Sequence, residues 1–219
     1  MELPAILEFL RDLNANNKRE WFHANAARHK DAKASFEVFT DMLITEIQEL
    51  DPSIAGVTGK GSMFRIHRDV RFSNDKRPYK TNFGSFMAPG GRKSGNAGYY
   101  IHMEPGKSFI GGGLYMPSPA SLKAIRKRIY ENPDSLLRIL NNPNFKTYFD
   151  GFYGNKLKTA PRGYPKDWEH VDLLNHKHYA VHHALPDDFW DSAQILEDCV
   201  RVFKAQHPLN LWLNETINK

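Results

Sequence analysis

Apolar residues recur at helical spacing through the first part of the chain. One run predicts a short helix whose buried face carries Leu3, Ile6, Leu7, Leu10 and Leu13. A second run, from about Ala24 to Leu50, predicts a longer amphipathic helix that Asp51-Pro-Ser ends. Residues 1–55 are therefore expected to be mainly helical.

The period of the pattern changes in the middle of the chain. Residues 62–72, 98–104 and 108–115 alternate or are rich in strand-forming residues, and Gly/Pro-rich connections separate them. Pro105-Gly106-Lys107 between the last two predicts a hairpin. Residues 60–116 are thus expected to hold a mostly antiparallel sheet.

Helical patterns return after Pro119 and continue, with irregular stretches, to residue 219. Residues 179–185 also fit a strand, and Pro186-Asp-Asp leads into a predicted C-terminal helix. The whole pattern predicts an α+β fold, a single domain over residues 1–219 with a central sheet bracketed by N- and C-terminal helices.

Composition agrees with one compact domain, since 41% of the 219 residues are hydrophobic. No apolar run approaches the roughly 20 residues that a membrane span needs, and the first residues do not resemble a signal peptide. We therefore expect a soluble, cytoplasmic protein without a membrane partner. The single cysteine, Cys199, lies on an apolar helical pattern and is expected in the core.

The net charge of the chain is concentrated in one segment. Seven basic and two acidic residues lie between Lys60 and Lys80, so this segment carries the whole formal charge of +5. A positive charge gathered in so short a stretch creates a local field that attracts anions.

The same segment combines this charge with an alternating pattern. As an extended strand it would turn Phe64, Ile66, Val70 and Phe72 to the core and Arg65, His67, Asp69 and Arg71 to the other face. Arg68 would then need a partner, because an unpaired buried charge is costly. A turn over residues 73–80 brings further polar side chains close behind, namely Lys76, Tyr79 and Lys80. The alternative interpretation is a solvated strand face on which Asp69 and Asp75 neutralise neighbouring arginines.

The segment resembles the signature of an uncharacterised bacterial family, also found as a region of longer fungal proteins, whose function is not established. The matching residues are Arg65, Arg68, Asp69, Arg71, Phe72, Asp75, Lys76 and Tyr79. Other recurring elements match over most of the chain, including residues 13–17, 21–22, 98–102, 111–117, 125–126 and 161–164. The resemblance implies that the charged residues and Tyr79 form the family's site, and it supplies no activity.

The favoured hypothesis is a pocket for a phosphate- or carboxylate-bearing small molecule. Its predicted ligand-binding residues are Arg65, Arg68, Arg71, Lys76 and Lys80, completed by His102, Arg126, Arg162 and Lys177. An enzymatic version adds Asp69 or Asp75 as general base and Tyr79 or a lysine as acid. The hypothesis predicts that Arg65, Arg68 and Arg71 converge in one concave site, with Asp69 in contact with at least one of them.

Two other functions are compatible with the segment. Basic residues beside Phe64, Phe72 and Tyr79 could bind nucleic acid, and the arginines could dock an acidic protein. Acids set between the arginines favour a preorganised pocket over either. His67 with Asp69, and His102 with Glu104, have spacings found in metal sites, but no stronger metal motif accompanies them and no metal is predicted. The sequence identifies no cofactor, reaction or oligomeric state.

Overall fold

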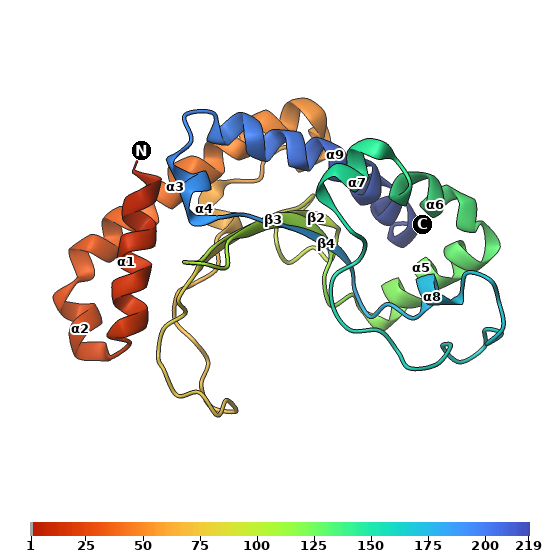
Figure 1. The fold of residues 1–219 in the computed structure, drawn as a ribbon, viewed down its shortest axis with the longest axis horizontal. Helices are drawn as coiled ribbons and strands as arrows, with labels where there is room; N and C mark the ends of the chain where they lie inside the picture. The colour runs from red at the N-terminus through yellow and green to blue at the C-terminus, as the bar shows by residue number, and fades with distance from the viewer. Residues whose placement is uncertain (1) are drawn as a thin grey trace.

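A computed structural model describes residues 2–219 and contains one antiparallel four-stranded sheet with helices around it (Figure 1). The strands pair in chain order, β1-β2-β3-β4, and all three pairings are antiparallel. Their bounds are β1 Phe83–Met87, β2 Gly98–Met103, β3 Phe109–Leu114 and β4 Tyr179–Ala184. The predicted α+β class, the hairpin at residues 105–107 and the strand near residues 179–185 are confirmed.

Helices precede the sheet, interrupt it between β3 and β4, and follow it. The N-terminal group comprises α1 Leu3–Ala15, α2 Arg19–Ala24, α3 Ala26–Leu50, a short 3-10 turn Pro52–Ile54, and α4 Gly59–Ser62. The group between β3 and β4 comprises α5 Pro119–Glu131, α6 Pro133–Leu140, α7 Pro143–Tyr148 and α8 Val171–Leu174. After β4 come a 3-10 helix, Asp187–Asp191, and α9, Ile195–Ile217. The predicted C-terminal helix therefore begins later than Pro186, after a separate turn.

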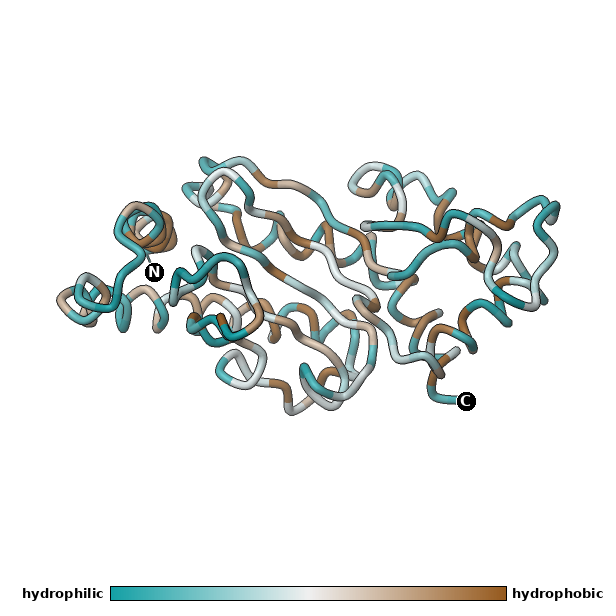
Figure 2. Tube along the Cα trace, turned by 90° about the horizontal axis from the view of Figure 1, so that it is seen from below, coloured by the Kyte–Doolittle hydropathy of each residue, from teal (hydrophilic) through white to brown (hydrophobic). Residues whose placement is uncertain are grey.

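Helices cover one face of the sheet. In Figure 1, α3 and α9 lie above the strands, whereas no helix lies directly beneath them. Figure 2, viewed from below, shows the strands crossing the middle of the molecule on this open side. Along β2 the side chains alternate accordingly: Tyr99, Ile101 and Met103 are buried against the helices, while Tyr100 and His102 belong to the open face.

A close approach of α9 to the sheet explains one of the glycines of β3. A Cβ on Gly112 would lie 2.7 Å from the side-chain nitrogen of Gln206, and the backbone has φ 140° there. That same Gln206 nitrogen donates a hydrogen bond of 2.9 Å to the carbonyl of Gly98. Glycine at position 112 thus lets Gln206 of α9 bond to the carbonyl of Gly98, the first residue of β2.

Aromatic side chains fill the space between the helices and the sheet. Phe36 stacks on Phe83 with ring centroids 5.6 Å apart, and Tyr99 meets Phe203 edge-on at 5.3 Å. Each such buried ring stabilises the fold by about 1.5–3 kcal/mol relative to an exposed one. Cys199 is fully buried in this core, as its apolar pattern predicts.

The strand predicted over residues 62–72 does not form. Residues 64–80, which we term the arm, instead fold back on themselves and hang below the sheet in Figure 1. The arm has two legs, the segment around Ile66 and Arg68 and the segment around Pro78 and Lys80. Backbone hydrogen bonds join them, from Lys80 N to Ile66 O at 2.8 Å and from Arg68 N to Pro78 O at 2.9 Å. Phe72, expected in the core, is 97% exposed. The physical reason is that the turn at residues 71–74 supplies a local partner, so the charged residues stay in water.

β1 is one of the two edge strands, and the sequence pattern does not indicate it. It is short, contains Gly84, and pairs with the preceding segment through an isolated bridge between Met63 and Ser85, where Phe64 N–H donates to the carbonyl of Gly84 at 2.9 Å. Within residues 2–219, no helix is both long and apolar enough to cross a membrane.

Candidate functional site

The open face of the sheet forms the floor of a cavity of about 660 Å³, which we term the sheet-face cavity. One wall comes from the base of the arm and the loops around β1, and the other from residues that follow β3 and from residue 153. Residues that bear on its chemistry are Phe64, Lys80, Asn82, Phe86, Arg92, Tyr100, His102, Phe109, Tyr115, Tyr153 and His182. A cavity of this size matches a small-molecule site.

Aromatic rings form the floor. The imidazole of His102 stacks on Phe109 with centroids 4.6 Å apart, and His182 meets the edge of the same phenyl ring at 5.9 Å. Tyr153 continues the row, 4.9 Å from His182. Such a surface can receive the flat, apolar part of a ligand.

A glycine makes room for one of these rings. A Cβ on Gly84 of β1 would lie 2.5 Å from the hydroxyl of Tyr100 on the neighbouring strand. Only glycine therefore allows Tyr100 to lie across β1 in its present position, with its hydroxyl in the floor of the cavity.

Two cations stand in the wall beside this floor. The ammonium of Lys80 and the guanidinium of Arg92 both lie over the ring of Phe64, at 5.5 Å and 5.3 Å from its centroid. Burial lowers the pKa of Lys80, and the positive charges of Arg65 and Arg92 act in the same direction. Across residues 2–219, no carboxylate forms an ion pair with any of these three cations. The two cations in the wall, Lys80 and Arg92, are therefore not paired with a carboxylate of the described residues.

A chain of polar contacts runs along β2 at the cavity floor. The hydroxyl of Tyr100 lies 3.0 Å from His102 Nδ1, and His102 Nε2 lies 3.2 Å from Glu104 Oε2. Thr81 Oγ1 donates to the second oxygen of Glu104 at 2.6 Å. Burial lowers the pKa of His102 despite the opposing effect of Glu104, and burial also raises the pKa of Tyr100 to about 12.

The acids of the arm pair with its arginines. Asp69 accepts bonds of 3.0 Å and 2.7 Å from Arg71. Asp75 lies 2.6 Å from Arg68 and 2.8 Å from Arg77. Arg71 holds the pKa of Asp69 below its usual value, and Arg77, followed by Arg68, does the same for Asp75.

The arginines predicted to converge, Arg65, Arg68 and Arg71, do not line the sheet-face cavity. Asp69 contacts Arg71, as expected, but Arg68 turns to Asp75, and neither arginine nor Arg65 lines the sheet-face cavity. The reason is local: each acid lies within a few residues of an arginine in a tight turn, so short-range pairs form first.

Two further residues of the arm have structural contacts. Tyr79 is buried and stacks on Phe22, with centroids 3.9 Å apart. The amide of Asn17 bonds to both the N–H and the carbonyl of Tyr79, at 3.1 Å and 3.0 Å. The ammonium of Lys76 donates to the carbonyl of Val70 at 3.1 Å. Tyr79 thus fastens the arm to the start of α2.

The more distant members of the predicted binding set lie elsewhere. Arg126 on α5 donates to the carbonyls of Leu174 and His176, at 2.8 Å and 3.2 Å. Arg162 and Lys177 are exposed, and none of these three cations lines the sheet-face cavity. Lys80 and His102 are the predicted residues that do.

Sequence reasoning misses the remaining cavity residues, chiefly Arg92, Tyr100, Phe109 and His182. One signal was present for Tyr100, because it alternates with His102 and Glu104 along β2 and so shares their face. Arg92 and His182 come from separate segments that only the fold brings together.

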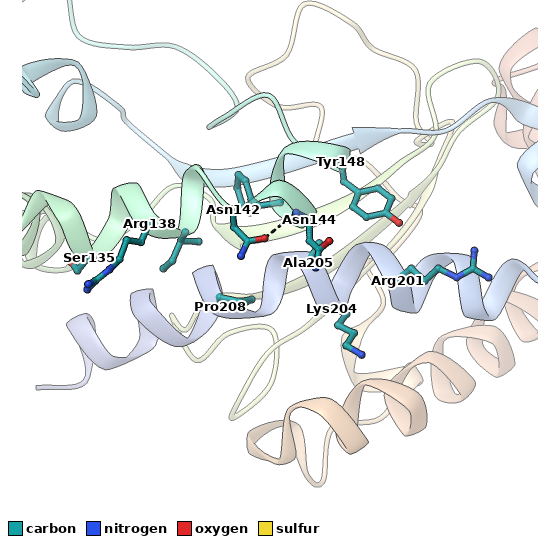
Figure 3. A pocket seen from close by; sticks show the side chains of 11 residues that line it. Ser135, Arg138, Asn142, Asn144, Tyr148, Arg201, Lys204, Ala205 and Pro208 are labelled. Atoms are coloured by element: carbon teal, nitrogen blue, oxygen red, sulfur yellow. Dashed lines mark hydrogen bonds between the residues drawn. The ribbon is translucent and has the colours of Figure 1, made fainter.

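A second cavity of about 560 Å³ lies between α6, α7 and α9 (Figure 3). It also carries cations, but Arg201 is paired with Asp198 at 2.9 Å. Asn142, drawn with a dashed bond in Figure 3, accepts from the N–H of Asn144 at 2.9 Å and so caps α7. Arg138 and Lys204 of this cavity form no ion pair among the described residues. The sheet-face cavity is the better candidate because its cations stand beside a row of stacked rings. The described residues contain no group of three or more His, Cys, Asp or Glu placed to hold a metal ion.

Comparison with known proteins gives one match. The model of a family described as "Conserved hypothetical protein (DUF2461)" matches residues 5–212, which include every strand and nearly all of α1 and α9. No curated protein and no solved structure matches the chain.

Proposed function

The chain belongs to the conserved hypothetical family DUF2461, and from the geometry of its sheet-face cavity we propose that it binds a small anionic molecule with a flat, apolar body. The observation that carries this proposal is an aromatic floor beside Lys80 and Arg92, two cations that are not paired with a carboxylate of the described residues.

The energetic argument begins with Lys80. Its ammonium is half-buried beside two guanidiniums, and each of these conditions disfavours the charged form. An anionic ligand would remove this repulsion and gain charge-assisted hydrogen bonds, which contribute about 1.5–3 kcal/mol each. A phosphate and a carboxylate offer the same contacts to the cations.

The floor defines the rest of the ligand. Tyr100, His102 and Phe109 present ring faces and edges next to the cations, on the face of the sheet that no helix covers (Figure 1). An aromatic or flat ligand body would gain about 0.5–1.5 kcal/mol from each favourable ring contact beyond its buried area.

The arm has a supporting role in this proposal. Asp75 neutralises Arg68 and Arg77, and Arg77 also donates to Asn14 of α1 at 3.0 Å. This network and the stacked Tyr79 hold the end of the arm in place. Lys80, the last residue of the arm, lines the cavity there. Arg65 remains exposed nearby and adds to the positive field.

Nucleic-acid binding is the second candidate, because Phe72 is 97% exposed at the end of the arm and the guanidinium of Arg71 lies 5.9 Å from its ring. An exposed ring beside a cation can stack on an unpaired base. Such binding would weaken steeply with salt, whereas a buried contact to one anionic group depends on salt less.

A thermal-shift screen tests the proposal. The panel contains nucleotides, sugar phosphates, short oligonucleotides and the matched pair phenyl phosphate and benzoate, which separates phosphate from carboxylate. We expect at least one small anion to stabilise the wild type, by about 2.7 kcal/mol when its concentration is 100 times Kd.

Two variants locate the binding. Lys80→Ala should lose the stabilisation, while Lys123→Ala, an exposed lysine of α5 outside the cavity, should keep it. Equal shifts in the wild type and Lys80→Ala would contradict the proposal. Stabilisation by oligonucleotides alone, lost in Phe72→Ala, would favour the second candidate.

A further inference from the structure

The polar chain of β2 combines three residues in a fixed order at the cavity floor. Tyr100, His102 and Glu104 occupy alternate positions on the open face, linked by contacts of 3.0 Å and 3.2 Å. Tyr100 and His102 both line the cavity, whereas Glu104 does not. The ring of Tyr100 lies next to Phe109, with centroids 5.5 Å apart.

The hydrogen-bond partners fix the direction of each bond. Glu104 is a carboxylate that only accepts, so the proton of neutral His102 belongs on Nε2. Nδ1 is then an acceptor, and the side-chain nitrogen of Asn82 also points to it from 3.4 Å. Tyr100 must therefore donate its proton to Nδ1, which leaves the lone pairs of its oxygen free for a ligand.

We propose that Tyr100, His102 and Glu104 form a proton relay, in which Tyr100 Oη acts as general base on an anionic substrate that carries an acidic hydroxyl or an acidic carbon–hydrogen bond. This inference rests on the proposed function, since it places the substrate in the same cavity. It adds an activity to what is otherwise a binding site.

The step balances without a further reactant. The substrate's proton leaves its oxygen or carbon and bonds to Tyr100 Oη, while the original phenolic proton moves to His102 Nδ1. The electron pair of the broken bond stays on the substrate, where Lys80 stabilises its negative charge. Glu104 stabilises the imidazolium that forms, and reversal of both transfers returns the proton and restores the relay.

The surroundings keep His102 able to accept a proton. Burial and the charge of Lys80 both oppose the imidazolium of His102, and together they outweigh Glu104, which favours it. Its pKa therefore lies below the usual value, and the ring is neutral at pH 7. Stacking on Phe109, with planes 16° apart, holds the imidazole in the orientation that reaches both Tyr100 and Glu104.

A similar set of residues in the core supplies an internal control. Tyr99 lies 2.6 Å from His207 Nδ1 and 2.9 Å from Asp51 Oδ2, so it too has an imidazole and a carboxylate. Tyr99, however, faces α9 and is fully buried, out of reach of any ligand. A reagent that enters the cavity should distinguish the two tyrosines.

The probe is N-acetylimidazole, which transfers an acetyl group to a phenolic oxygen and releases imidazole. Peptide mass spectrometry measures the rate at each tyrosine between about pH 6 and pH 9.5, a range that separates histidine from tyrosine titration. Because neutral His102 takes the proton, the rate at Tyr100 should be level from about pH 7 upward. N-acetyltyrosine amide added as a free reference should instead react faster as pH rises toward the phenolic pKa of about 10. Tyr99 should not react, because it is fully buried.

The variant Glu104→Gln should slow the acetylation of Tyr100 by about tenfold or more, since the imidazolium loses its carboxylate. It should leave the rate at Tyr130, an exposed tyrosine outside the cavity, unchanged. A Tyr100 rate that rises with pH like that of free N-acetyltyrosine amide, or that is equal in Glu104→Gln, would overturn the relay. If Glu104→Gln does not fold, the pH profile of the wild type decides alone. Since this reaction needs no substrate, its failure leaves anion binding standing, whereas an anion screen without a Lys80-dependent shift contradicts the binding itself.

Discussion

Asp75 Oδ2 lies 2.6 Å from Arg68 Nη1 and joins the two legs of the arm. The pair is half-exposed, so its free energy is small, but its position matters because the backbone bond from Arg68 to Pro78 lies beside it. Arg68 also donates to the carbonyl of Arg77 at 3.3 Å. One carboxylate therefore organises the segment that leads into Lys80.

Asp75→Asn should loosen the arm without unfolding the protein. We expect faster amide exchange at Arg68 and Lys80, whose N–H groups bond across the legs, with a global loss of only about 0–1 kcal/mol, as for surface ion pairs. Asp69→Asn is the matched control, since Asp69 pairs with Arg71 and joins no legs. Equal exchange in both variants would contradict this role of Asp75.

Gly84→Ala should disturb the cavity floor. The new methyl group would lie 2.5 Å from Tyr100 Oη, so the ring must move, at a cost of about 1–3 kcal/mol in the free energy of unfolding. Denaturant titration measures that cost, and the acetylation rate of Tyr100 should change as well. Ser85→Ala, the next position but on the opposite face, removes a buried hydroxyl without a partner and should cost little.

Tyr99→Phe should destabilise the core. It removes the hydroxyl that bonds Asp51 and His207, and a buried carboxylate that loses a partner costs about 1–3 kcal/mol. Tyr115→Phe, at a 60% exposed tyrosine, should change the urea midpoint negligibly. A midpoint for Tyr99→Phe equal to that of the wild type would show that the buried hydroxyl contributes nothing.

Stability should fall in mild acid because of His176. Burial, together with Lys156, lowers the pKa of His176 to about 4, whereas the unfolded chain has the ordinary value of 6.5. Between these values the unfolded state binds more protons, so this contribution is complete above pH 6.5 and is lost as pH falls toward 4. The loss should be on the order of 2 kcal/mol.

The variant His176→Phe tests this assignment. Its Tm should depend less on pH between 6.5 and 4 than that of the wild type, because the titrating group is gone while an aromatic ring still meets Phe152. Identical pH dependence in both proteins would assign the acid sensitivity to other groups.

The elements that the sequence predicts well are those whose pattern is set by a single buried face. Leu3 to Leu13 and Phe36 to Ile47 each repeat at helical spacing because each helix packs on one side. The hairpin at residues 105–107 is likewise local. β1 cannot be predicted in this way. Gly84 makes room for Tyr100 on the neighbouring strand and Phe86 lines the cavity, so neither residue contributes to a strand pattern in the sequence.

The candidate site follows the same division. Lys80 and His102 are recognisable from charge and strand alternation, but the concave surface arises from chain reversal and sheet pairing. The charged pattern of the arm predicts a strand, but a segment forms a strand only where it can pair with the edge of a sheet. Here Asp69 and Asp75 pair with arginines of the same short segment, which folds back on itself. Arg92 becomes relevant only because its loop packs on Phe64.

The order of the strands has a consequence for how the protein is made. During synthesis β1, β2 and β3 can pair as soon as they emerge, but β3 must wait for residues 115–178 before β4 arrives. Until then the glycines at 111–113 form an unprotected edge, and strands with few side chains define their register weakly. A nascent chain stalled before Tyr179 would thus expose the unpaired edge of β3, which is prone to aggregation. Chaperones that bind exposed strand edges should matter most while residues 115–178 are being synthesised.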